Sequence, residues 1–205
     1  MNKDEALAEV KKLLPEKRYI HTLGVVESAM ELAARYGGDS KKAELAAILH
    51  DITKYFPVDQ LREYIETHDE IPSDMLSYHP SLWHSPVGAV YVKEQFGIQD
   101  QEVLDAITYH TTGRTGMSLL EKIVFLADYI EPGRSFPGVD EVRQMAKESL
   151  DLAVAKALAN TTQFLVENYK QVYPDTISAY NDLIKDNGKK LADWKKERGN
   201  GFENE

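Results

Sequence analysis

Residues 122–130 read Lys-Ile-Val-Phe-Leu-Ala-Asp-Tyr-Ile, an apolar run that the carboxylate of Asp128 interrupts. Ser118 and Glu121 precede this run with the spacing of a capping box, and Pro132 follows it, so we expect one helix between these signals. A helix this apolar is expected to be largely buried, where an unpaired carboxylate costs several kcal/mol. We therefore expect Asp128 to pair with a cation, to bind a metal ion or to be protonated.

The rest of the chain also predicts helices. Apolar positions recur with helical spacing on both sides of the 122–130 run, and Val, Ile and Thr do not accumulate in the alternating pattern of strands. Residues 72–84 are rich in Pro, Ser and aromatic residues and predict a loop with one short helical turn. The expected helices cover about residues 3–14, 16–36, 40–53, 58–68, 85–96, 100–110, 119–131, 139–169 with a joint near 148–151, and 175–186.

Composition favours one domain with a polar end. Residues 1–186 are predicted to form an all-α helical bundle. After Asn187 the composition shifts to Lys, Asp, Glu, Gly and Asn, which predicts a frayed or disordered tail over residues 187–205. The longest apolar runs are too short to span a bilayer, and the charged residues of the first 14 positions argue against a signal peptide. The expected location is therefore the cytoplasm, with no membrane partner.

Charge and cysteine content restrict the function. The 205 residues include no Cys, which excludes disulfides, thiol nucleophiles, iron–sulfur clusters and Cys-ligated zinc, so that His, Asp and Glu must hold any metal. Lys and Arg number 24 against 34 Asp and Glu, giving a net charge of −10 that opposes broad binding to long nucleic acids. A small anionic substrate remains compatible if its site has local cations.

A His-Asp pair directly follows the apolar segment 45–49. We expect the helix to continue to about Thr53. Adjacent residues of a helix point ~100° apart, so the side chains of His50 and Asp51 can both reach one ion that lies beside the helix. Alone this dipeptide is a weak signal, because a single His on an apolar helix more often belongs to the core. Further candidate ligands strengthen it, and the complete set is His21, His50, Asp51, His84, His110 and Asp128. Imidazole and carboxylate ligands suit Fe, Mn, Zn or Co.

Three cations accompany these residues. Lys54 lies three residues after Asp51, and on a continuous helix the two would share one face. Arg18 precedes His21 by three residues, and Arg134 follows the Pro-Gly signal, where a mobile loop could bring its guanidinium to a phosphate. For Arg18 and Lys54, ion pairs within a helix are the structural alternative. His68 and His79, in polar or Pro-rich surroundings, are expected to face solvent or pack in a loop.

Four segments carry a family resemblance over about residues 10–185. The chain resembles the HD-domain metallophosphohydrolases and, more closely, the bacterial YqeK family of symmetrical bis(5'-nucleosyl)-tetraphosphatases. The HD dipeptide alone is unspecific, whereas the four segments in this order are highly specific. They are His-Asp-Ile-Thr-Lys at 50–54, His-Ser-Pro-Val-Gly-Ala at 84–89, Ile-Thr-Tyr-His-Thr-Thr-Gly-Arg at 107–114 and Leu-Ala-Asp-Tyr-Ile-Glu-Pro-Gly-Arg at 126–134.

The resemblance implies roles for the candidate residues. The principal metal ion, iron by family expectation with Mn, Co or Zn as alternatives, would be held by His21, His50, Asp51 and Asp128. His84 and His110 would either contact phosphate oxygens or form a second metal site with Asp51 as a bridge. Phosphate contact, and hence one ion, is favoured because only three ligands would remain for a second ion. The segment 170–175 would help wall the nucleotide, with Tyr173 as the candidate within it.

The predicted function is metal-dependent hydrolysis of diadenosine tetraphosphate and related dinucleoside polyphosphates to two ADP by a metal-activated water. Asp51 would orient the water, while Lys54, His84, His110 and Arg134 would gather phosphate charge and Arg18 would bind substrate. The alternatives are an HD-type nucleotidase or dNTP phosphohydrolase and, outside enzymes, a nucleotide-binding regulatory module. Apolar positions within 152–165 suit either the core or the face of a homodimer.

Overall fold

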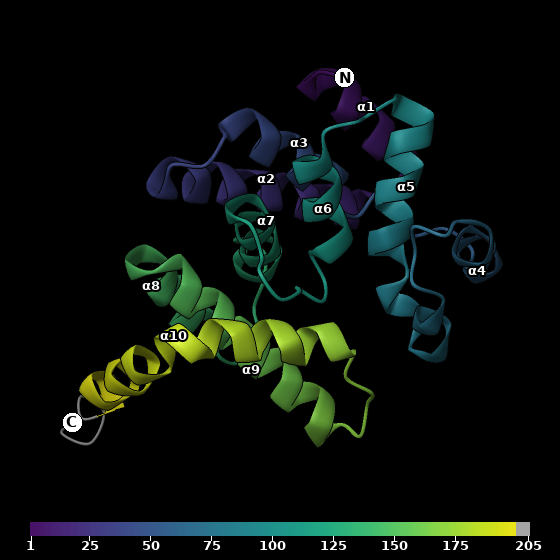
Figure 1. Cartoon of the computed structure of the whole chain (residues 1–205). Helices are drawn as coiled ribbons and strands as arrows, with labels where there is room; N and C mark the ends of the chain where they lie inside the picture. Colours follow the sequence, from purple (N-terminus) through teal and green to yellow (C-terminus); the bar gives the residue numbers. More distant parts are fainter. Residues whose placement is uncertain (200–205) are drawn as a thin grey trace.

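The computed structural model describes residues 1–199, and within that range it contains α-helices, two short 3₁₀ helices and no strand (Figure 1). The all-α prediction is confirmed. The elements in chain order are α1 (Lys3–Leu13), α2 (Glu16–Tyr36), α3 (Ser40–Leu49), α4 (Val58–Thr67), η1 (Ser73–Ser77), η2 (Pro80–Leu82), α5 (His84–Phe96), α6 (Gln101–Tyr109), α7 (Leu119–Ile130), α8 (Val139–Glu148), α9 (Leu150–Glu167) and α10 (Pro174–Gly199).

Helix α7 is the centre of the main core. It packs against α2, α3, α6 and α9, and Figure 1 shows α2 and α3 on one side of it and α9 and α10 on the other. The capping box at its start is present, since the Ser118 hydroxyl accepts the amide of Glu121 at 3.2 Å. The side chains of Ile123 and Leu126 are fully buried. The apolar run therefore forms the predicted helix.

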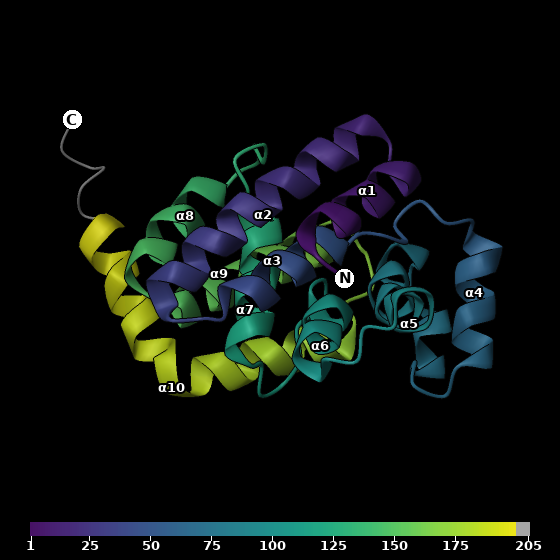
Figure 2. The same cartoon turned by 90° about the horizontal axis from the view of Figure 1, so that it is seen from above.

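A second, smaller apolar cluster lies where α4, η1, η2 and the start of α5 meet, at the edge of the bundle in Figure 2. Trp83 is buried in it and donates its indole N–H to the carbonyl of Met75 at 2.9 Å. This bond fixes the chain immediately before His84, the first residue of α5. Residues 72–84 thus contain two 3₁₀ helices where the sequence suggested one short turn.

Helix α3 ends four residues earlier than expected. It stops at Leu49, and the following residues form tight turns in which the amide of Ile52 bonds to Leu49 and that of Lys54 to Asp51. The buried Thr53 hydroxyl donates to the carbonyl of His84 at 2.7 Å and ties these turns to α5. The prediction of a continuous helix on which Asp51 and Lys54 share one face is therefore wrong. Helical propensity cannot anticipate the tertiary bond from Thr53 to His84.

The C-terminal third follows the expectations in part. The joint between α8 and α9 falls at Ser149, whose side chain caps α9. The apolar positions Leu152, Val154, Ala155 and Leu158 are buried in the core, and a homodimer stays a prediction. Helix α10 continues to Gly199, through much of the segment assigned to a tail, while residues 200–205 lie outside the described part of the chain. The boundary at residue 186 stays a prediction.

In the described part of the chain, every helix is too short or too polar to traverse a lipid bilayer.

Candidate metal centre

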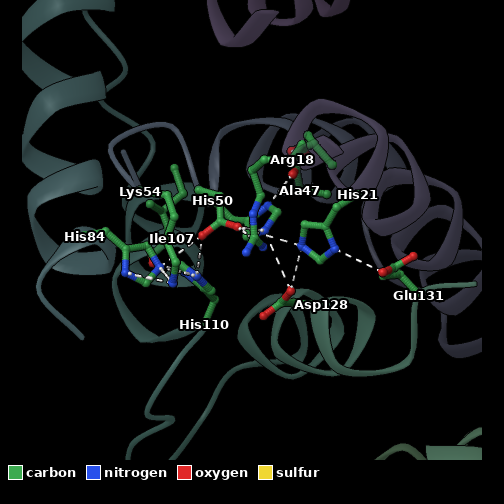
Figure 3. A network of polar contacts seen from close by, with 12 residues as sticks. Arg18, His21, Ala47, His50, Lys54, His84, Ile107, His110, Asp128 and Glu131 are labelled. Carbon is green, nitrogen blue, oxygen red and sulfur yellow. Dashed lines mark hydrogen bonds and ion pairs between the residues drawn. The ribbon is translucent and has the colours of Figure 1, made fainter. Parts of the chain in front are cut away.

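Five helices and the turns after them bring the six predicted ligands together. Figure 3 shows five of them, His21, His50, His84, His110 and Asp128, in one polar network, and the sixth, Asp51, lies within 4 Å of all four histidines. His21 comes from α2, His50 and Asp51 from the turns directly after α3, His84 from the start of α5, His110 from the turn directly after α6, and Asp128 from α7.

The two oxygens of Asp51 face different histidines. Its Oδ2 lies 3.2 Å from Nε2 of His50 and 3.7 Å from Nε2 of His21. Its Oδ1 lies 3.0 Å from Nε2 of His84 and 3.7 Å from Nε2 of His110. Asp128 joins the first group, with Oδ1 3.0 Å from Nε2 of His21. Asp51 is thus shared between two sets of nitrogen atoms.

All four imidazoles are oriented in the same way. Each directs Nδ1 outward to an acceptor and Nε2 inward to the carboxylates. Three of the acceptors are backbone carbonyl oxygens: that of Ala47 for His50 at 2.7 Å, that of Ser81 for His84 at 2.7 Å and that of Ile107 for His110 at 2.8 Å. The fourth is Oε1 of Glu131, which lies 3.0 Å from Nδ1 of His21. A carbonyl or carboxylate oxygen can only accept, so Nδ1 carries the proton and Nε2 of the neutral ring presents a lone pair. Four lone pairs therefore point toward carboxylate oxygens.

Burial and charge set the protonation states in this cluster. Burial raises the pKa of Asp51, but the neighbouring His50, His110 and His84 outweigh it and hold that pKa well below its usual range. Burial lowers the pKa of His84 to about 4 and also lowers the pKa of His110. For His50 the charges of Asp51 and Asp128 outweigh burial, and its pKa is raised. Asp51 is therefore ionised near neutral pH, while His84 and His110 are neutral ligand-type imidazoles.

The donor set fits a divalent metal ion. Nε2 of His21 and Nε2 of His50 are buried without a hydrogen-bond partner, a cost that a bound cation removes. Three overlapping groups have all their ligand atoms within 4.8 Å of one another: His21 with His50 and Asp51, His50 with His110 and Asp128, and Asp51 with His84 and His110. Nitrogen and carboxylate ligands with Nδ1 hydrogen-bonded outside are the usual surroundings of Zn, Fe, Mn or Co.

Asp128 is less buried than its apolar helix suggested. Its side chain keeps 20% of its exposure, and Arg134 donates to its Oδ1 at 2.6 Å and to its carbonyl at 2.9 Å. Burial raises the pKa of Asp128, but His21 and Arg134 lower it more strongly. The expectation that Asp128 is deeply buried is therefore corrected. Asp128 both pairs with a cation, Arg134, and lies among the candidate metal ligands. Arg134 is anchored rather than placed on a free loop.

Two further cations reach the cluster. Arg18 donates to Oδ2 of Asp51 at 2.8 Å, and Nζ of Lys54 lies 3.3 Å from Nε2 of His84. Burial lowers the pKa of Lys54. Together with Arg134, these side chains form a cationic rim around ligands that otherwise carry negative charge.

Tyr173 lies outside the metal cluster, in the small apolar cluster with Trp83. It is buried, its ring meets Tyr78 edge to face at 4.9 Å, and its hydroxyl donates to Asp74 at 3.4 Å. Burial raises the pKa of this hydroxyl. These contacts are structural, and the nucleotide role of Tyr173 stays a prediction.

His68 and His79, the two histidines not assigned to the metal centre, also lie outside the metal cluster. His68 pairs with Glu94 at 3.1 Å, and His79 accepts the amide of Ser81 within its loop.

Sequence reasoning missed Glu131. It is 4% exposed, accepts the Nδ1 proton of His21, and also accepts the amide of Gly133. Gly24 faces it across the gap between α2 and the end of α7, where a Cβ would come within 2.6 Å of Oε2 of Glu131. A carboxylate at the end of the apolar α7, just before Pro-Gly, was the available signal, but its partner on α2 is 110 residues away.

We expect Glu131→Gln to weaken metal binding by about 10- to 100-fold, because a neutral amide no longer raises the basicity of the His21 ring. Gly24→Ala should act in the same direction by displacing Glu131. Glu121→Gln is the matched control, since Glu121 is equally buried but pairs with Arg114. Isothermal titration calorimetry with the metal ion measures the affinity of each variant. Equal losses in the Glu121 and Glu131 variants would refute a specific role for Glu131.

The chain is similar to several known proteins. The HD domain family matches residues 18–133. A protein of Bacillus subtilis named bis(5'-nucleosyl)-tetraphosphatase, symmetrical, is 52% identical over 90% of this chain and 98% of its own. A protein of Staphylococcus aureus with the same name is 45% identical over 88% and 94%.

The chain is also similar to a solved structure. A crystal structure of a Clostridium acetobutylicum protein, described as a predicted HD superfamily hydrolase involved in NAD metabolism, is 40% identical, with a TM-score of 0.84 over 90% of this chain and 98% of that one. The chain aligns with these relatives over about nine-tenths of its length, and it belongs to the HD-domain family.

Proposed function

We propose that this protein is a metal-dependent hydrolase that splits diadenosine tetraphosphate symmetrically into two ADP. One observation carries the proposal: four imidazoles, each with Nδ1 hydrogen-bonded outside the cluster, direct Nε2 at the carboxylates of Asp51 and Asp128, which is the arrangement that a bound cation stabilises. The names of the Bacillus and Staphylococcus relatives supply the substrate and the symmetry of the cut.

The chemistry of this centre is hydrolytic. A divalent metal ion held by His21, His50, Asp51 and Asp128 supplies Lewis acidity, which polarises phosphoryl oxygens and acidifies water. Iron stays the family expectation, and Mn, Co and Zn suit the same ligands. Elemental analysis of purified protein identifies the metal.

We also propose a second ion at Asp51, His84 and His110. The preference for phosphate contact rested on the small number of remaining ligands, yet three protein ligands with open positions are common in catalytic metal sites. The distance of 3.2 Å between Nε2 of His84 and Nε2 of His110 supports this alternative, as does the direction of both lone pairs. Neutral imidazoles are also poor partners for phosphate, because Nε2 carries no proton.

The cations and Asp51 have complementary roles. Arg18, Lys54 and Arg134 neutralise the negative charge that develops on the phosphate chain. Because the whole protein is acidic, this positive charge must come from side chains within the site. Each guanidinium has five N–H donors and uses only part of them in the contacts to Asp51 or Asp128, which leaves donors for phosphate oxygens. Asp51 accepts hydrogen bonds and orients the attacking water.

The reaction itself fixes the product pattern. Water adds to an inner phosphorus, and the bond from that phosphorus to the central bridging oxygen breaks, so both products are nucleoside diphosphates. Attack at an outer phosphorus would give ATP and AMP instead. We therefore expect ADP alone from diadenosine tetraphosphate, with slower hydrolysis of ATP and dGTP. Chromatography of the products after partial turnover measures this, with the chelated protein as control.

Two alternatives give different results. A preference for ATP or dGTP would favour the nucleotidase or dNTP phosphohydrolase, with the metal centre unchanged. Binding without turnover by the metal-loaded protein would favour a regulatory module, although such a module would be expected to lose ligands and this chain keeps all six. The cytoplasm stays the predicted location.

A further inference from the structure

A groove of about 730 Å³ lies beside the metal centre along α2. Its inner end, next to the candidate ligands, is lined by His21 itself, by Arg18, which contacts Asp51, and by Arg134, which contacts Asp128. The size is that of a pocket for a small organic ligand, roughly 300–1,000 Å³. Further lining residues come from one face of α2, from the turn after α3 and from the loop after α7: Lys17, Ile20, Leu23, Gly24, Glu27, Tyr55 and 131–133.

Besides Lys17 and Glu27, the rest of this groove is lined by apolar and aromatic side chains that are exposed to solvent. Tyr55 is 55% exposed, Ile20 is 60% exposed and Leu23 is 41% exposed. Lys17 and Glu27 are ten residues apart on α2 with His21 between them, so at 1.5 Å per residue the groove runs for about 15 Å past the metal centre. An extended nucleoside diphosphate has this scale, with phosphates at the charged end and a base at the apolar end.

The position of the groove relative to the metal centre matters for a symmetrical substrate. Figure 3 places His84 and Glu131 at opposite ends of the polar network, with His50 and His21 between them. The segment expected to wall one nucleotide holds Tyr173, which packs in one cluster with Trp83, the neighbour of His84. The groove is lined by His21 and Glu131 and not by His84 or Tyr173.

We propose that this groove binds the second nucleoside of the dinucleoside tetraphosphate, with the base stacked on Tyr55. The inference rests on the proposed function and extends it. The cut lies midway between two identical nucleoside diphosphates, so each side of the metal centre must accept one of them. Arg18 and Arg134 at the inner end meet the phosphates of this half.

A second cavity, of about 710 Å³, fits this role less well. It is lined by Tyr129, Phe136 and Phe164 and by none of the six candidate metal ligands. Its charges are Lys156, which pairs with Glu141 at 3.0 Å, and Glu167, so it presents no net positive charge to a phosphate chain.

The test compares Tyr55→Ala with Phe164→Ala, because both aromatic rings are 55% exposed and each lines one cavity. Tyr55→Ala should lower kcat/KM for diadenosine tetraphosphate about tenfold, mainly through KM, since stacking of one base is lost. Phe164→Ala should retain the wild-type value, and Tyr55→Phe should restore it. ADP titration of the metal-loaded protein supplies a second readout: wild type should bind two equivalents, and Tyr55→Ala should weaken one of them.

Three outcomes would overturn the inference: an unchanged KM in Tyr55→Ala, a loss confined to Phe164→Ala, or dissociation of a wild-type dimer by Tyr55→Ala, which would assign the groove to a subunit contact. ADP titration does not depend on turnover, so failure of this inference is separable from failure of the proposed function, which product chromatography on wild type decides.

Discussion

Asp51→Asn is expected to lower kcat/KM for diadenosine tetraphosphate by roughly a thousandfold, because the metal contributes several kcal/mol of transition-state stabilisation and its shared ligand loses its charge. Asp51 is 2% exposed, and its two oxygens face all four histidines, so no neighbouring side chain can replace it. Metal content, measured by elemental analysis after gel filtration, should fall together with the rate.

Asp105→Asn is the matched control. Asp105 also pairs with an arginine, Arg114 at 2.8 Å, but it lies outside the metal cluster. This variant should lose at most some stability and keep its metal and rate. If Asp51→Asn kept full metal content and lost only thermal stability, Asp51 would be an ion-pair partner of Arg18 and the proposed centre would be refuted.

Local signals predicted most of the helices. The apolar run and capping box of α7 and the Ser149 joint were readable because apolar spacing and caps act within a few residues. The end of α3 was misjudged because the turns after Leu49 depend on the bond from Thr53 to His84, 31 residues away. Local propensity has no information about such a partner.

The candidate site was predictable to a similar degree. The residue types in the six ligand positions were sufficient to suggest a metal, but the role of Asp51 as a shared carboxylate follows only from where its two oxygens point. The exposure of Asp128 depends on Arg134, which the sequence placed on a mobile loop. The role of Glu131 could not be predicted from the sequence, because it depends on the space that Gly24 on α2 leaves for the Glu131 carboxylate where the two helices pack.

His110→Gln tests whether a second ion binds. The Nε2 atom of His110 lies 3.2 Å from that of His84 and 3.7 Å from Oδ1 of Asp51, while its Nδ1 is committed to the carbonyl of Ile107. We expect the variant to carry one metal ion where wild type carries two, because His21, His50 and Asp128 are left intact. We also expect kcat to fall by about 10²- to 10³-fold, as for loss of a major electrostatic contact in the transition state.

His68→Gln is the control for this substitution, since His68 pairs with Glu94 far from the cluster and should change neither metal content nor rate. An unchanged metal content in His110→Gln together with the loss of rate would assign His110 to phosphate contact and return the centre to a single ion. The distinction is chemical: a phosphate contact needs a proton on Nε2, whereas the carbonyl of Ile107 keeps the proton of the neutral ring on Nδ1. A metal ion is the partner that this tautomer accepts, so metal stoichiometry is the measurement that separates the two roles.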